Sequence, residues 1–216
     1  EADDASLYCW AISMSSGGEA ALTRSHFDKR RSIFACEDWE VMSDGSLDPV
    51  PVTIIGALKS PVASWGSWAN SKVFVRAWHA AFRGDKWRRR GWVVKVDPDT
   101  VWHPERLRQH VRPHSAVEPL CIKNPGKILL GPIEVMNHAA MAKFNRLRDK
   151  CGTGSDGGED GWLGWCMGWI GIPLSDDAAL MHLDGGVGAC AQGWTVAFHP
   201  FKDVGSYEAC YWKGAR

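Results

Sequence analysis

The stretch Gly91-Trp92-Val93-Val94-Lys95-Val96 predicts a buried strand, and it runs directly into Asp97-Pro98-Asp99. A short apolar run rich in valine is typical of a strand in the middle of a parallel sheet. Alternate residues of an extended chain point the same way, so Asp97 and Asp99 could face one ion. An acidic turn is the alternative interpretation, because Asp-Pro-Asp also favours a simple turn.

Predicted strands and helices alternate on both sides of this stretch. Such alternation predicts an α/β fold with a mostly parallel central sheet. A chain of 216 residues fits one domain, which we expect to span residues 1–216. The predicted strands are Leu7–Ile12, Ser32–Cys36, Trp39–Met42, Gly91–Val96, Lys127–Val135 and Gly193–Phe198, and the predicted helices are Glu19–Arg30, Ser71–Phe82, Pro104–His110, Asn137–Arg148 and Glu159–Trp169.

The charge balance argues against a nucleic-acid-binding protein. Basic and acidic residues number 25 each, whereas a nucleic-acid binder normally carries a basic excess. Arg88-Arg89-Arg90 is a dense basic run that we interpret as a solvated connection. No apolar run reaches the ~18 residues that a membrane-spanning helix needs. The chain starts at Glu1 without a methionine, so a fragment or a processed form is expected.

The seven cysteines form no C-x-x-C pair and no cluster with zinc-finger spacing. They could be buried thiols of a reduced protein, since free cysteine is often buried. They could instead form up to three disulfides in an oxidising, lumenal compartment. We favour disulfides, because several of the cysteines lie in glycine-rich or polar stretches. The odd cysteine would then be free or bonded to another chain.

Two further groups of residues could carry chemistry. Glu159 and Asp160 are flanked by glycines at a predicted helix start, where a carboxylate could act as a general base. His199 follows the last predicted strand and could be a metal ligand through its neutral imidazole. Each also has a plain structural interpretation. Acids stabilise the N-terminus of a helix, and a histidine can simply be hydrogen-bonded at the edge of a sheet.

Taken in order, these segments resemble the glycosyltransferase A (GT-A) fold, especially the fringe and β-1,3-galactosyltransferase-like group. That group has a strand ending in D-D-D-T-[YF]-V, a helix containing leucine, an acceptor-side strand, E-D-V-x-x-G-x-C and a late histidine. In this chain Trp92–Val101 reads W-V-V-K-V-D-P-D-T-V, and Leu107 follows. Leu129–Val135 corresponds to the acceptor-side strand, Glu159–Cys166 to the E-D segment and His199 to the late histidine.

Most of the chain also resembles a large set of uncharacterised glycosyltransferase-like proteins from unicellular algae. That resemblance implies a fold and brings no established activity with it. The matching blocks are Ser6–Cys9, Ser32–Cys36, Val94–Asp99, Pro104–Arg108 and Ala197–Lys202.

The resemblance implies a GT-A-like, nucleotide-diphospho-sugar transferase domain in the Golgi or a similar lumenal compartment. The implied reaction moves a sugar from a nucleoside diphosphate to a hydroxyl of a glycan or protein. Mn²⁺ or Mg²⁺ would neutralise the departing diphosphate. The implied roles are metal ligation by Asp97, Asp99 and His199, base catalysis by Asp160, orientation of the base by Glu159, and substrate binding by Trp162 and Lys95, with Lys95 expected to point away from the metal.

Two other functions stay open at this point. Pro98 stands where the resembling group usually has aspartate, and glycine follows Asp160. A non-catalytic structural or binding subunit that keeps the fold is therefore the main alternative. Such a subunit could bind a protein partner through the unpaired cysteine. Thirteen tryptophans also allow a carbohydrate-binding module that uses Trp65 and Trp68.

Overall fold

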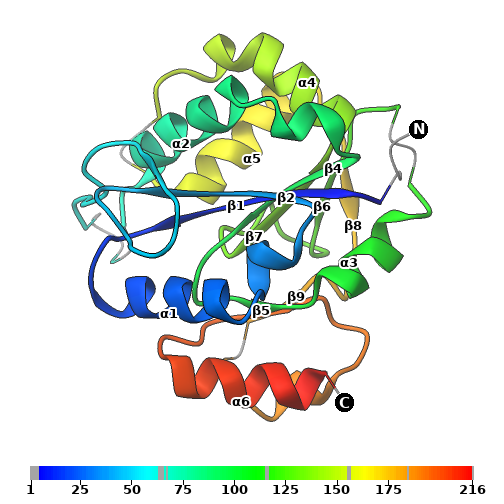
Figure 1. The fold of residues 1–216 in the computed structure, drawn as a ribbon. Coiled ribbons are helices and arrows are strands. Elements are labelled where there is room, and N and C mark those ends of the chain that lie inside the picture. The colour runs from blue at the N-terminus through cyan, green and yellow to red at the C-terminus, as the bar shows by residue number, and fades with distance from the viewer. Residues whose placement is uncertain are drawn as a thin grey trace.

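The computed structural model describes residues 5–62, 66, 68–114, 117–154, 157–183 and 185–215. Its centre is a seven-stranded sheet with the order β3-β2-β1-β4-β7-β6-β8 (Figure 1). β7 runs antiparallel to both of its neighbours, and the other pairings in this sheet are parallel. The predicted α/β fold with a mostly parallel sheet is therefore confirmed. The strands are β1 (Leu7–Ser13), β2 (Asp38–Ser43), β3 (Thr53–Ile54), β4 (Trp92–Val96), β6 (Cys121–Lys123), β7 (Ile133–Asn137) and β8 (Leu174–Asp176).

Helices cover both faces of this sheet. Figure 1 shows α2, α4 and α5 on one face, and α1 and α3 on the other, with α6 beyond α1. Among the described residues, no helix combines the length and the apolar character that crossing a membrane requires. The helices are α1 (Gly17–Asp28), α2 (Ser71–Arg83), α3 (Pro104–Val111), α4 (His138–Leu147), α5 (Glu159–Trp169) and α6 (Val204–Gly214).

The strands contribute alternate residues to two hydrophobic cores. Tyr8 and Trp10 of β1 pack with α2, α4 and α5, whereas Leu7 and Cys9 face α1 and α3. β4 follows the same period of two. Its residue Val93 belongs to the core under α2 and α5. Lys95 is two residues further along, so its side chain must enter that same apolar layer.

A second, three-stranded sheet of order β5-β10-β9 lies beyond the end of β4. β5 (Val101–Trp102) follows the Asp-Pro-Asp segment directly and pairs antiparallel with β10 (Ala197–Phe198). β9 (Met181–His182) pairs parallel with β10 on its other edge. The β5–β10 pairing brings the residues just before β5 beside the residues just after β10. This juxtaposition is what places His199 next to Asp99.

Several predicted boundaries differ from the structure. The predicted strand Ser32–Cys36 is wrong, because Ser32–Ala35 forms a 3-10 helix (η1). A short apolar run cannot be distinguished by periodicity from a buried turn of helix. Here Ser32 takes a φ of 53°, which no strand allows. The strand predicted from Lys127 begins only at Ile133. The late strand predicted over Gly193–Phe198 contains only two strand residues.

Six of the seven cysteines form disulfides. The pairs are Cys9–Cys36, Cys151–Cys166 and Cys190–Cys210. Disulfides form and persist in oxidising compartments, so the three bonds are consistent with a secreted or lumenal location. Cys121 is the free cysteine, and it is fully buried in β6. Its thiol cannot reach another chain, so the structure gives no support to a partner bound through the unpaired cysteine.

This cysteine arrangement predicts a specific labelling pattern. We expect iodoacetamide to modify no cysteine of the native protein, because Cys121 is inaccessible. In denaturant without reductant it should add one group per chain, and after reduction it should add seven. Intact-mass spectrometry counts the adducts. Three or more adducts in denaturant without reductant would contradict the three disulfides.

Candidate metal centre and the charges behind it

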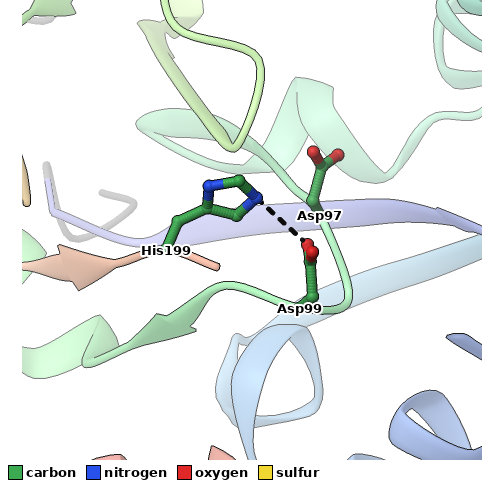
Figure 2. A group of neighbouring side chains, drawn as sticks. All are labelled: Asp97, Asp99 and His199. Atoms are coloured by element: carbon green, nitrogen blue, oxygen red, sulfur yellow. Dashed lines mark ion pairs between the residues drawn. The ribbon is translucent and has the colours of Figure 1, made fainter. Parts of the chain in front are cut away.

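Asp97, Asp99 and His199 come together at the carboxyl end of β4. One ligand atom from each lies within 4.8 Å of the others. Figure 2 shows the three side chains gathered where the Asp-Pro-Asp turn meets the chain after β10. His199 Nε2 is 3.4 Å from Asp99 Oδ1. Two carboxylates and an imidazole suit Mn²⁺, and the carboxylates suit Mg²⁺, so this group could hold one divalent cation.

Two backbone hydrogen bonds and one from a histidine side chain hold the Asp-Pro-Asp turn from three sides. The Asp97 N–H donates to the Pro132 carbonyl over 3.0 Å, which ties the turn to the segment before β7. The Phe201 N–H donates to the Asp99 carbonyl over 2.8 Å, which ties it to the chain after His199. His26 of α1 lies on the third side, with Nε2 2.9 Å from the Pro98 carbonyl. The turn therefore presents its two carboxylates from a fixed backbone.

His26 is a neutral hydrogen-bond donor in this arrangement. Burial lowers its pKa to about 4, so the ring carries one proton at neutral pH. The Pro98 carbonyl can only accept, so that proton must be on Nε2. The ring also packs against Tyr207 of α6, with centroids 4.2 Å apart. His26 thus connects the turn to two helices that the sequence analysis did not associate with the site.

Asp99 is charged and already has a histidine and a lysine as hydrogen-bonding neighbours. Burial alone would raise its pKa, but the hydrogen bonds from His199 and Lys202 outweigh burial and lower the pKa to about 2. The Lys202 ammonium contacts Asp99 Oδ2 directly, although 76% of that lysine side chain is exposed. The ammonium therefore pairs with the Asp99 carboxylate from the solvent side.

Asp97 is bound to a buried ammonium on its other side. Lys95 Nζ is 2.8 Å from Asp97 Oδ1 and 3.3 Å from Glu159 Oε2. Lys95 was expected to point away from the metal, but its ammonium contacts Asp97, one of the candidate ligands. Burial alone would lower the pKa of Lys95, but the charges of Asp97, Glu159 and Glu134 raise it above its usual value. Lys95 remains protonated because it is surrounded by carboxyl groups.

Glu159 and Glu134 are the buried members of this charge cluster. Glu134 is the β7 residue directly opposite Lys95, and its side chain is fully buried. Burial, together with the charge of Glu159, raises the pKa of Glu134 well above its usual value. Burial raises the pKa of Glu159 to about 7 although Lys95 lowers it. These two acids therefore favour their protonated forms far more than surface carboxylates do.

Asp160 lies beside this cluster, and its charge adds to the effect of burial in raising the pKa of Glu159. It is half-buried at the first turn of α5, and its Oδ1 accepts from the Gly161 N–H over 2.8 Å. No described ion pair connects it to Asp97, Asp99 or His199. An acid at this position is stabilised by the helix dipole.

The predicted tryptophan contacts have different surroundings. Trp162 is only 8% exposed, and its indole N–H donates to the Cys151 carbonyl over 2.9 Å. Most of that ring therefore packs in the core under α5. Trp68 is 56% exposed, while Trp65 lies outside the described residues.

Three neighbours of the site were missed by sequence reasoning. Lys202 had a usable signal, since it is a basic residue three positions after a candidate ligand. Glu134 also had one, because an acid interrupts the apolar run Ile133–Met136. His26 had none, because its contact with Pro98 joins residues 72 positions apart.

Comparison with known proteins shows the fold. No family model and no curated protein matches this chain. Among solved structures, it is similar to a glycosyltransferase involved in the glycosylation of the major capsid of PBCV-1. The TM-score is 0.51 at 10% sequence identity, and the match covers 98% of this chain and 100% of the other. An identity this low shows the fold and does not transfer the activity. The chain therefore has an α/β, GT-A-like fold.

Proposed function

We propose that this protein is a metal-dependent glycosyltransferase, in which residues 1–216 act as one domain. It would transfer a sugar from a nucleoside diphosphate to a hydroxyl of a glycan or protein. The observation that carries the proposal is the convergence of Asp97, Asp99 and His199 at the carboxyl end of β4. Ligands of open α/β sheets bind at the carboxyl ends of the strands. The glycosyltransferase with a similar fold supports the same reaction class.

The donor set fits a divalent cation. Asp99 is ionised and Asp97 is paired with an ammonium, so both offer anionic oxygens, and His199 adds a nitrogen. This mixture favours Mn²⁺, while Mg²⁺ would use the two carboxylates. When bound, the cation would supply charge neutralisation for the leaving diphosphate. The chain's contribution is to hold these ligands on a turn that its backbone hydrogen bonds already fix.

Lys202 would exchange one anionic partner for another. Without a cation its ammonium pairs with Asp99. An ion bound by Asp99 would compete with that ammonium, and the mostly exposed side chain could turn toward the diphosphate. Phosphate oxygens accept charge-assisted hydrogen bonds from lysine. Lys202 is thus proposed to bind the donor.

Asp160 would be the general base, at the first turn of α5. It is the half-exposed acid of the Glu159–Asp160 pair, so an acceptor hydroxyl could reach it. Glu159 is buried and would orient the helix start rather than touch the acceptor. Trp162 and Lys95 were expected to bind substrate, and their burial leaves them supporting roles in this proposal. Membership of the fringe and β-1,3-galactosyltransferase-like group and a location in the Golgi belong to the same proposal.

The competing function is a non-catalytic subunit that keeps the fold. One observation favours it: Trp165 and Trp169 of α5 stack on each other while remaining 55% and 64% exposed. Exposed aromatic pairs of this kind are common at protein interfaces. Ligand binding separates the two functions, because only the enzyme needs a nucleotide site.

The first prediction concerns metal-dependent nucleotide binding. We expect Mn²⁺ with the matching nucleoside diphosphate to raise the melting temperature, because ligand that binds only the folded state stabilises it by about 2.7 kcal/mol at one hundred times its Kd. Asp99→Asn should abolish the rise. Asp85→Asn, which removes an exposed acid that precedes β4 and not one at its carboxyl end, should keep it. No rise with any nucleoside diphosphate would favour the non-catalytic subunit.

A second prediction separates the two roles of Lys202. Lys202→Met should strengthen the binding of Mn²⁺ alone, since the competing ammonium is gone. It should weaken the binding of the nucleoside diphosphate in saturating Mn²⁺, on the order of tenfold for a lost charge-assisted hydrogen bond. Isothermal titration measures both constants. If the Kd of Mn²⁺ and the Kd of the nucleoside diphosphate changed in the same direction, Lys202 would not be a donor-binding residue.

A third prediction concerns the base. Asp160→Asn should lower the rate of sugar transfer, or of donor hydrolysis, roughly 10²- to 10⁴-fold, because the carboxylate can no longer take the proton. The affinity for Mn²⁺ and nucleotide should stay close to that of the wild type, since Asp160 makes no ion pair with the described metal ligands. Initial rates and titrations on the same preparations check both statements. An unchanged rate would exclude Asp160 as the base.

A further inference from the structure

Lys95 contacts three separate parts of the chain with one ammonium group. Its Nζ reaches Asp97 Oδ1 after β4 and Glu159 Oε2 at the start of α5, over 2.8 Å and 3.3 Å. It also donates to the Gly131 carbonyl in the segment before β7. An ammonium has three protons, so these three acceptors use all of them. The two ends of the proposed reaction site therefore share one donor.

The surroundings of Lys95 exclude other partners. Its side chain is fully buried. The Phe74 ring of α2 lies 4.4 Å from Nζ, in a cation–π contact. Gly131 allows the close approach, because a Cβ at that position would lie 3.0 Å from Glu159 Oε2. The ammonium has no direct access to solvent and remains shared among the groups around it.

The cluster holds more carboxyl groups than the ammonium can satisfy. Asp97, Glu159 and Glu134 surround one positive charge. Both oxygens of Glu134 and Oε1 of Glu159 are buried, and besides burial, a hydrogen bond between these two carboxyl groups contributes to the raised pKa of Glu134. Asp97 and Glu159 therefore compete for Lys95. Any cation that takes up the charge of Asp97 would leave more of the ammonium to Glu159.

We propose that Lys95 is a positioning residue that links the Asp97–Asp99–His199 centre to the first turn of α5, so that cation binding and the placement of that turn depend on each other. The proposal rests on the proposed function for its metal site and adds coupling to it. Coupling of this kind is reciprocal. If cation binding stabilises the contact of Lys95 with Glu159, that contact must increase the affinity for the cation by the same free energy. Because Asp160 follows Glu159 directly, cation binding would also act on the position of the proposed base.

The link itself can be tested without any metal. Asp97→Asn removes one competitor for Lys95, whereas Asp99→Asn removes an equal charge from the same turn without touching Lys95. We expect Asp97→Asn to slow amide hydrogen exchange at the start of α5, around Glu159 and Trp162, and Asp99→Asn to leave it unchanged. Mass spectrometry of the corresponding peptide measures the exchange. Equal effects of the two variants, or none from either, would overturn the link.

The coupling to a cation needs a second measurement. Glu159→Gln leaves Lys95 with Asp97 as its remaining ion-pair partner. Mn²⁺ must then displace a stronger Lys95–Asp97 ion pair in order to bind Asp97. We expect its Kd to rise on the order of fivefold or more, the usual range of coupling between sites. Asp160→Asn makes the equivalent acid-to-amide change one residue later without touching Lys95, and should change the Kd much less. Equal changes would mean that general electrostatics, and not Lys95, connects the two places.

The two arms separate failure of the link from failure of the proposed function. If the wild type binds no Mn²⁺, the metal site and its coupling are both rejected. Amide hydrogen exchange in the Asp97→Asn variant still decides whether Lys95 links Asp97 to the start of α5. If Mn²⁺ binds but Glu159→Gln leaves its Kd unchanged, the function survives and the coupling is rejected. Lys95 itself is left in place, because its removal would leave three acids without compensation and would test folding instead.

Discussion

The buried ammonium of Lys95 is the constraint on which the arrangement of this site depends. Burying a lysine charge in an apolar core is very costly unless it is paired and hydrogen-bonded. Lys95 enters the core under α2 and α5 because it lies in register with Val93 on β4. Carboxyl groups must therefore come to it, and Asp97 and Glu159 do so from different elements. This requirement fixes the end of β4 relative to the start of α5.

The second constraint is the small β5-β10-β9 sheet. Without it, the Asp-Pro-Asp turn would have two carboxylates and no third ligand. The antiparallel β5–β10 pairing places Asp99 and His199 side by side, and the Phe201 N–H closes the arrangement on the Asp99 carbonyl. Below this sheet, the Cys190–Cys210 disulfide joins α6 to the segment before β10. The His199 segment is thus held by strand pairing on one side and by a covalent bond nearby.

Fold and site contribute differently to the functional argument. The GT-A-like fold is shared with a viral-capsid glycosyltransferase at an identity too low to carry an activity. The chemical argument comes from side chains: a carboxylate whose pKa is held near 2, an adjacent imidazole and an exposed ammonium that pairs with the carboxylate. Such a group could hold a divalent cation. The same fold without this group would suit a structural subunit equally well.

The sequence by itself determined the alternation of elements, the start of α5 at Glu159 and the acids after β4, because these follow from local composition and periodicity. The order of the three site segments was also legible, and the structure brings Asp97, Asp99 and His199 together. The sequence did not reveal that Ser32–Ala35 is a turn of helix, since a short apolar run has no distinguishing period. Only the tertiary structure decided the partners of Lys95 and the contact of His26 with Pro98. Apart from the neighbouring Asp97, those contacts join residues 36 to 72 positions apart. Strand register and burial select them, and a linear pattern contains neither.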